Sequence, residues 1–84
     1  MLDNKDMKDN VQNRKRQIGL NIAFYRRMKN MSQEALAGAV MISRQWLAAL
    51  ESPATDRMCS VDVLLNIADA LEIPPARLFD FKDL

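Results

Sequence analysis

An all-α domain of five helices is predicted by three features of the sequence. The 84 residues are enough for one small domain, and a hydrophobic content of 49% comes with only two glycines and three prolines. Apolar residues recur at spacings of three and four, which places them on one side of a helix. Ser32, Ser43 and Ser60 each follow an apolar residue and stand four positions before a leucine, a pattern typical of helix starts. A single core built from helices is therefore expected.

Residues 1–12 are predicted to form a flexible N-terminal tail, and residues 13–84 are predicted to form the folded domain. The tail alternates aspartate, asparagine, lysine and methionine with no helical period, and so polar a segment buries too little apolar surface to fold by itself. An arm lying along DNA is the alternative, although the aspartates favour the disordered interpretation.

The first helix is predicted to begin near Asn10 or Asn13 and to end near Lys29. A glycine inside it, Gly19, costs about 1 kcal/mol relative to alanine, which indicates close packing against another helix. The inward positions of this helix, at helical spacing, are Val11, Ile18, Ile22 and Tyr25.

Two short helices follow, at 33–39 and 44–50, and only the turn at 40–42 separates them. Their apolar positions lie on faces that meet, and the small side chain of Ala37 allows the two helices to cross closely. The residues that stay outward on the second of these helices are Arg44, Gln45, Ala48 and Ala49.

The last two helices are predicted at 61–71 and 75–79. Pro75 suits the first position of a helix, where its missing N–H has no partner to lose. An apolar stripe of the 61–71 helix is expected in the core: Val61, Leu64, Leu65, Ala68 and Leu71. The apolar residues near the C-terminus are expected either to close the core or to form a dimer contact: Leu78, Phe79, Phe81 and Leu84.

Composition argues against several classes of protein. The chain has no histidine and a single cysteine, Cys59, so an internal disulfide, the usual zinc sites and histidine-based catalysis are not expected. It also has no glycine-rich phosphate loop and no nucleophile beside a base, so neither an enzyme nor a bound cofactor or metal is expected. No apolar run reaches the length of a membrane span and the N-terminus has no signal-peptide core, so a cytoplasmic protein is expected.

Charge is unevenly distributed, although the net charge is only +1. Residues 1–30 contain eight lysines and arginines against three aspartates, whereas residues 60–84 contain two basic and five acidic residues. A basic first third favours a polyanionic partner such as nucleic acid. The alternative is that Arg14, Lys15 and Arg16 lie on a helix face that contacts only solvent. Basic residues near a helix start interact unfavourably with the helix dipole, which favours a binding role for them.

Eight residues match the spacing of a known motif: Gln33, Leu36, Ala37, Val40, Ile42, Leu47, Leu50 and Glu51. The chain from about Ile18 to Phe79 thereby resembles the Xre-type helix-turn-helix family of phage repressor and Cro-like proteins. The resemblance implies a compact repressor-like DNA-binding domain whose second and third helices form the helix-turn-helix. It also implies an ion pair between Arg26 and Glu51. Met41 stands where the family usually has glycine, and a left-handed backbone there costs a non-glycine residue about 1 to 2 kcal/mol, so the turn is expected to be either strained or slightly different in geometry.

The resemblance further implies which residues contact DNA. With the third helix in the major groove, Arg44 is expected to bind guanine and Gln45 adenine, while Ala48 and Ala49 allow close approach to the bases. Trp46 is expected to pack on the following loop, with a DNA contact as the alternative. Contacts to phosphate are expected from Gln33, Ser43, Arg14, Lys15, Arg16 and Arg57; a helix cap alone also explains Ser43, and a solvated loop arginine also explains Arg57.

The expected function is sequence-specific binding of double-stranded DNA by a transcriptional regulator, such as a repressor of phage or mobile-element type. One domain offers only two long base-contacting side chains, so a homodimer on a pseudo-palindromic operator is expected. A DNA-binding antitoxin and a restriction-system controller are alternatives with the same fold. A helical adaptor that binds protein is an alternative from another class, which the salt dependence of binding to random duplex distinguishes.

Overall fold

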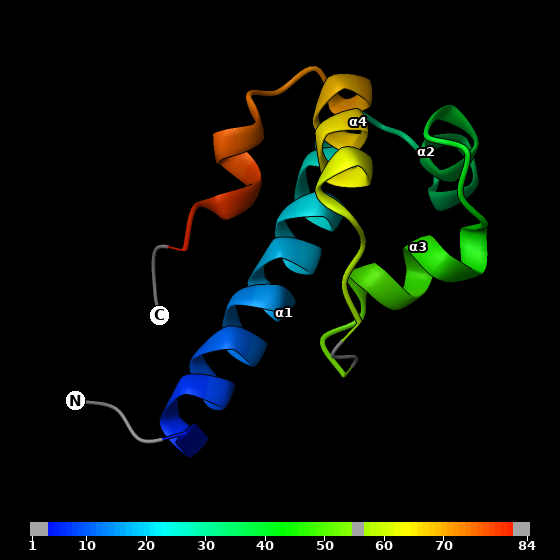
Figure 1. Cartoon of the computed structure of the whole chain (residues 1–84). Coiled ribbons are helices and arrows are strands. Elements are labelled where there is room, and N and C mark those ends of the chain that lie inside the picture. The colour runs from blue at the N-terminus through cyan, green and yellow to red at the C-terminus, as the bar shows by residue number, and fades with distance from the viewer. Residues whose placement is uncertain (1–3, 55–56, 82–84) are drawn as a thin grey trace.

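The computed structural model describes residues 4–54 and 57–81, and the regular elements in this part of the chain are all helices (Figure 1). It contains four α-helices and one 3₁₀ helix, so the prediction of a fifth α-helix is wrong: so short a segment after two prolines adopts the tighter form. The elements are α1 (Asn4–Met28), α2 (Gln33–Ala39), α3 (Arg44–Glu51), α4 (Val61–Leu71) and η1 (Pro75–Phe79). None of the helices described is both long and apolar enough to cross a lipid bilayer.

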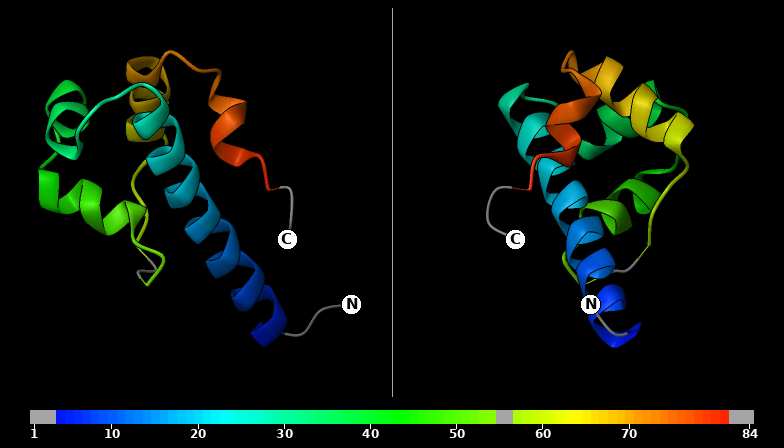
Figure 2. Two further views of the ribbon diagram at one scale, coloured as in Figure 1. Left: turned by 180° about the vertical axis from the view of Figure 1, so that it is seen from behind. Right: turned by 60° about the vertical axis from the view of Figure 1, so that its left-hand side comes forward.

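Helix α1 begins well before its predicted start, because residues 4–12 of the predicted tail are already helical. No proline or glycine occurs between residues 4 and 18, and a helix that is already formed gains one hydrogen bond for each residue it adds. The N-terminal half of α1 extends past the other helices (Figure 2). Val11 is consequently exposed and does not belong to the core, contrary to prediction.

The hydrophobic core lies where the five elements meet. Helix α4 contributes Leu64, Ile67, Ala68 and Leu71, which follow the spacing of a single buried stripe. The predicted stripe of α4 is too wide, because Val61 and Leu65 are 67% and 45% exposed. Neighbouring elements cover only one side of α4, so the apolar residues at the edge of its stripe remain in solvent. The largest side chains buried completely are Ile22, Leu36, Leu47, Leu50, Ile67 and Leu78.

All three predicted serine caps are present. The hydroxyl oxygens of Ser32 and Ser43 each accept a hydrogen bond from the backbone N–H three residues later, with N···O distances of 3.0 Å. Ser60 makes the same contact at 3.2 Å. Caps of this kind contribute about 1 kcal/mol each, so local sequence sets where α2, α3 and α4 begin.

Helix α1 crosses α3 at Gly19. A Cβ atom added to Gly19 would overlap the carbonyl oxygen of Leu50 and lie 3.1 Å from its carbonyl carbon. Both are backbone atoms, so rotation of a side chain does not make room. The close packing predicted from this glycine is confirmed, and it brings the middle of α1 against the end of α3.

Element η1 packs against α1 and α4 on the side of α1 away from α3 (Figure 1). Leu78 is completely buried, so of the two roles expected for the C-terminal apolar residues it closes the core, and it does not belong to a dimer contact. The Asn21 side chain holds this segment by donating Nδ2–H bonds to the carbonyl oxygens of Leu78 and Asp80, at 3.0 and 3.2 Å.

The remaining residues of the predicted dimer contact differ in exposure. Phe79 is exposed and Phe81 is half-buried. Their rings form an edge-to-face pair with centroids 6.3 Å apart. Leu84 lies outside the described residues. An exposed aromatic surface at Phe79 therefore remains for a contact between copies.

Candidate nucleic-acid interface

Helices α2 and α3 are connected by a turn closed by backbone hydrogen bonds. The N–H of Ile42 donates to the carbonyl oxygen of Ala37 at 3.0 Å, and the N–H of Met41 donates to that of Gly38 at 3.3 Å. Met41 has a φ of 61°, and its side chain is 92% exposed. The left-handed backbone expected at this position is present, so the turn keeps its geometry without a glycine.

Replacing Met41 by glycine is expected to stabilise the fold by about 0.5 to 1 kcal/mol. Glycine removes the 1 to 2 kcal/mol cost of a left-handed backbone, and part of this gain is offset by the greater entropy of glycine in the unfolded chain. Urea denaturation measures the change. The matched control is Met41→Ala, which keeps a Cβ and loses only an exposed side chain, so its stability should stay near wild type. A less stable Met41→Gly variant contradicts the assigned strain.

The outward face of α3 carries the predicted base-contacting residues. Arg44 and Gln45 are exposed at its N-terminal end, and Ala48 and Ala49 are half-buried farther along. Figures 1 and 2 show α3 at the edge of the molecule, on the opposite side of α1 from η1. A helix with long hydrogen-bonding side chains at one end and small residues beyond them has a shape that fits the major groove.

A buried ion pair connects α1 to the end of α3. Arg26 Nε donates to Glu51 Oε2 at 2.8 Å and Arg26 Nη2 donates to Glu51 Oε1 at 2.9 Å, so the expected pair is present. The third nitrogen, Nη1, donates to the carbonyl oxygen of Met31 at 2.8 Å. The hydrogen bond from Glu51 raises the pKa of Arg26 above its ordinary value, which keeps the guanidinium charged. A two-pronged contact of this kind is directional, so it holds α3 at a defined angle to α1.

Gln33 belongs to the same network. Its Nε2 donates to Glu51 Oε1 at 3.0 Å, which ties the first turn of α2 to the carboxylate that holds α1 and α3. The sequence predicted a phosphate contact for Gln33. It did not predict the bond to Glu51, because Gln33 and Glu51 are 18 positions apart on different helices. An amide nitrogen carries two hydrogens, so one N–H of Gln33 is left for a phosphate oxygen.

Trp46 lies at the edge of the outward face of α3, against the loop that follows. The guanidinium carbon of Arg57 lies 5.7 Å from the centroid of the Trp46 ring, within the range of a cation–π contact. The contact places a loop arginine beside α3. The predicted packing of Trp46 on the following loop is confirmed, but the sequence did not identify Arg57 as its partner, since no periodic pattern links a helix residue to a residue in a loop.

The basic residues of α1 lie on a different part of the surface from Arg44. Arg14 and Arg16 are exposed and Lys15 is half-buried. Arg16 Nη1 donates to Asn13 Oδ1 at 3.1 Å. All belong to the half of α1 that extends past the C-terminal end of α3 (Figures 1 and 2). The structure therefore places them beside one end of α3, with Arg44 and Gln45 at the other end.

Cys59 is half-buried beside the core. Burial raises the pKa of its thiol above the ordinary value. Little reactive thiolate is present near neutral pH as a result.

Two short helices joined at a tight turn, with the polar end of the second exposed, define a helix-turn-helix protein. A family model described as helix-turn-helix matches residues 22–78. The chain belongs to this family and is a DNA-binding transcriptional regulator of the Xre type.

Among solved structures, the chain is similar to the restriction-modification controller protein C.AhdI from Aeromonas hydrophila, known from a high-resolution crystal structure. The two are 31% identical with a TM-score of 0.70, and the match covers 76% of this chain and 94% of that chain. A search of curated protein sequences finds no match to this chain.

Proposed function

We propose that the protein recognises a specific double-stranded DNA operator by placing α3 in the major groove. The observation that supports this most directly is the exposure of Arg44 and Gln45 at the end of a helix held in place by the buried Arg26–Glu51 pair. A helix can distinguish bases only if its angle to the DNA is fixed, because each base contact depends on hydrogen-bond geometry. No step of this function requires catalysis.

The base contacts follow from the chemistry of the exposed side chains. Arg44 has the paired donors that match O6 and N7 of guanine, and the Gln45 amide matches N6 and N7 of adenine. The small residues Ala48 and Ala49 let the helix approach the bases and contact a thymine methyl group. Each well-placed pair of hydrogen bonds discriminates between bases by about 1 to 3 kcal/mol.

Contacts to phosphate position the protein without selecting a sequence. Gln33 has an N–H left for this role beside the ion pair, and Arg57 is placed beside α3 by Trp46. Ser43 already accepts the capping hydrogen bond of α3, and its hydroxyl hydrogen is a donor suited to a phosphate oxygen. The other phosphate contacts belong to the extended half of α1: Arg14, Lys15 and Arg16.

A homodimer on a pseudo-palindromic operator is part of the proposal. One copy presents only two long base-contacting side chains, whereas two copies on half-sites roughly 34 Å apart double the specific contact. The exposed ring of Phe79, with Phe81 and Leu84, is the proposed contact between copies. Deleting residues 81–84 should weaken self-association of the protein, measured by sedimentation.

Two regulatory roles fit this interface. A repressor of phage or mobile-element type follows from the sequence resemblance, and a restriction-modification controller is favoured by the 31% identity to a protein of that description over most of its length. Both use the same DNA-binding geometry. The genes beside the operator distinguish them, because a controller should lie with a restriction enzyme or methyltransferase.

Replacing Arg44 by alanine is expected to weaken operator binding by about 1 to 3 kcal/mol, or roughly five- to 150-fold, with little effect on random duplex. The operator is first obtained by selecting bound sequences from a random pool, and affinity is then measured by fluorescence anisotropy. Arg14→Ala is the contrasting variant: it should weaken binding to both duplexes alike and reduce the salt dependence by about one unit of slope. Equal losses on both duplexes for Arg44→Ala would overturn the proposed base contact.

A further inference from the structure

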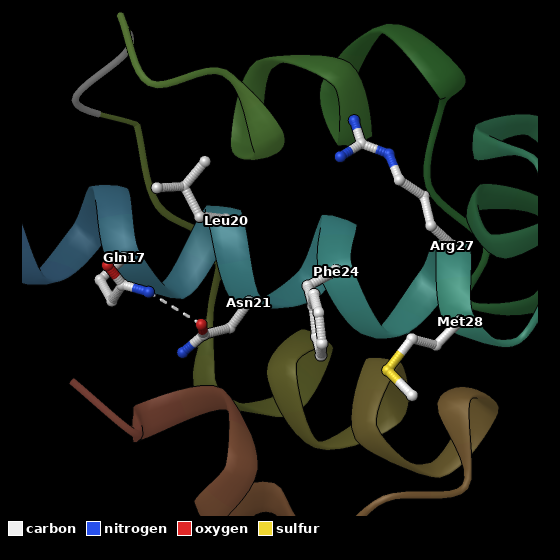
Figure 3. A pocket seen from close by; sticks show the side chains of 6 residues that line it. All are labelled: Gln17, Leu20, Asn21, Phe24, Arg27 and Met28. Carbon is white, nitrogen blue, oxygen red and sulfur yellow. Dashed lines mark hydrogen bonds between the residues drawn. The ribbon is translucent and has the colours of Figure 1, made fainter. Parts of the chain in front are cut away.

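The outer face of α1 exposes apolar side chains that the DNA-binding role does not use. Leu20, Phe24 and Met28 stand four residues apart and are 43%, 55% and 65% exposed. Three such residues in a row on one side of a helix are more than scattered surface apolar residues. Figure 3 shows them on α1 around a shallow hollow of about 560 Å³. The residues that line it are Gln17, Leu20, Asn21, Phe24, Arg27 and Met28.

The charge of this α1 face is positive. The one charged residue among those lining the hollow is Arg27, which is exposed. Gln17 and Asn21, at the other border, are neutral and bonded to each other at 2.9 Å. The sequence contains no acidic residue between positions 10 and 28. A partner that covers this face should therefore be apolar at its centre and acidic at its border.

Helix α4 presents a surface of that kind. Val61 and Leu65, one turn apart, are 67% and 45% exposed. Asp62 and Asp69 are exposed on the same side of the helix and border them with negative charge. Apolar burial and opposite charge thus favour contact between the α1 face and this α4 face.

The two faces cannot meet within one molecule. Helix α4 lies in front of α1 in Figure 1, and α1 lies in front of α4 when the molecule is seen from behind in Figure 2. The α1 face points away from the core, on the side opposite α4. Only a second copy can bring an α4 face against it.

We propose that the α1 face of one copy binds the α4 face of a second copy. Contact between two α1 faces would bring the Arg27 side chains of both copies together, and contact between two α4 faces would bring the aspartates together. Contact between an α1 face and an α4 face instead joins opposite charges around an apolar centre. Each such contact is head-to-tail and leaves one face open at each end, so association continues beyond two copies. This contact is separate from the symmetric one at Phe79 and does not depend on which DNA sequence is bound.

Sedimentation velocity of the full chain without DNA, over a wide range of concentrations, tests the proposal. The wild-type protein should form assemblies whose mass continues to increase as the protein concentration rises. Phe24→Ser and Leu65→Ser should each stop this growth, because each removes the centre of one face. Both side chains are about half exposed, so both variants should fold, which circular dichroism verifies. Wild-type protein that stops growing at a dimer overturns the proposal.

Mixing the two variants distinguishes a head-to-tail contact from a symmetric one. The Leu65→Ser copy keeps its α1 face and the Phe24→Ser copy keeps its α4 face, so an equimolar mixture should form complexes larger than either variant forms alone. Failure of the variants to combine, with growth still lost in each alone, indicates that a face pairs with itself and overturns the proposal.

A charge reversal adds a second readout. Arg27→Glu should weaken the growth by placing like charges on the two faces, whereas Arg44→Glu, an equal change on α3, should leave it unchanged in the absence of DNA. If Arg27→Glu and Arg44→Glu change self-association equally, the α1 face is not the contact surface. Operator binding by Phe24→Ser at low protein concentration should match wild type, so loss of self-association and loss of DNA recognition are separate outcomes.

Discussion

Replacing Glu51 by alanine is expected to lower the free energy of unfolding by about 3 to 5 kcal/mol. The change leaves the guanidinium of Arg26 buried without its two hydrogen-bond acceptors, and an uncompensated buried charge carries a cost of this size. It also removes the acceptor of Gln33. Thermal unfolding followed by circular dichroism should show a melting temperature lower by about 12 °C or more, given the usual dependence for domains of this size.

A double variant separates the cost of the buried charge from the value of the pair itself. Arg26→Met combined with Glu51→Leu removes both charges and fills the space with apolar atoms, and such replacements are often neutral or stabilising. We expect the double variant to recover most of the lost stability while binding the operator less well, because α3 loses its directional link to α1. If Glu51→Ala is too unstable to measure, Glu51→Gln provides a milder change with the same sign. An unchanged melting temperature for Glu51→Ala would show that the pair is not buried in solution.

Replacing Gly19 by alanine is expected to destabilise the fold by about 3 kcal/mol, at the upper end of the usual cost of overpacking. The new Cβ would overlap the carbonyl oxygen of Leu50, and the contact is relieved only if α1 and α3 move apart. This cost exceeds the gain of about 1 kcal/mol that alanine brings to a helix interior. Urea denaturation measures the loss, and operator affinity should fall with it because α3 changes its angle.

The chain contains its own control for this change. Gly38 is the other glycine, and a Cβ added there meets no atom within 4 Å. Gly38→Ala should therefore stabilise the protein by up to about 1 kcal/mol through helix propensity alone. A Gly19→Ala variant that gains stability as Gly38→Ala does would refute the close crossing of α1 and α3.

The same two contacts connect stability to recognition. The Arg26–Glu51 pair and the Gly19 crossing both lie at the C-terminal end of α3, whereas Arg44 and Gln45 lie at its N-terminal end. One end of the helix is held by the domain and the other is presented to solvent. Recognition then depends on residues that do not themselves contact DNA, because they set the direction in which the exposed end points.

Local features of the chain were predictable from the sequence. The bounds of α2 and α4 and the serine caps follow from interactions within a few residues. The resemblance supplied the Arg26–Glu51 pair, which no local pattern contains. Of the proposed binding residues, those on α3 were the simplest to predict, because helical spacing separates Arg44 and Gln45 from the buried side of the helix.

Other features depended on which elements pack together. Hydrophobic spacing predicted a buried stripe on α4 but not its width, so Val61 and Leu65 were assigned to a core that they do not enter. Leu78 was expected either to close the core or to join a contact between copies, and the packing of η1 against its own chain places it in the core. The partner of Gln33 and the stacking of Arg57 on Trp46 join residues on different elements.

The sequence by itself determined where α2, α3 and α4 begin, that a tight turn joins α2 to α3, and which polar residues that unit presents. Those outcomes depend on backbone geometry and on hydrogen bonds within one turn, which nearby residues set. Only the tertiary structure decided the angle of α3, the burial of Leu78 and the exposure of the outer faces of α1 and α4. Burial is a property of what a neighbouring element covers, and periodicity in one helix carries no information about how far that neighbour reaches.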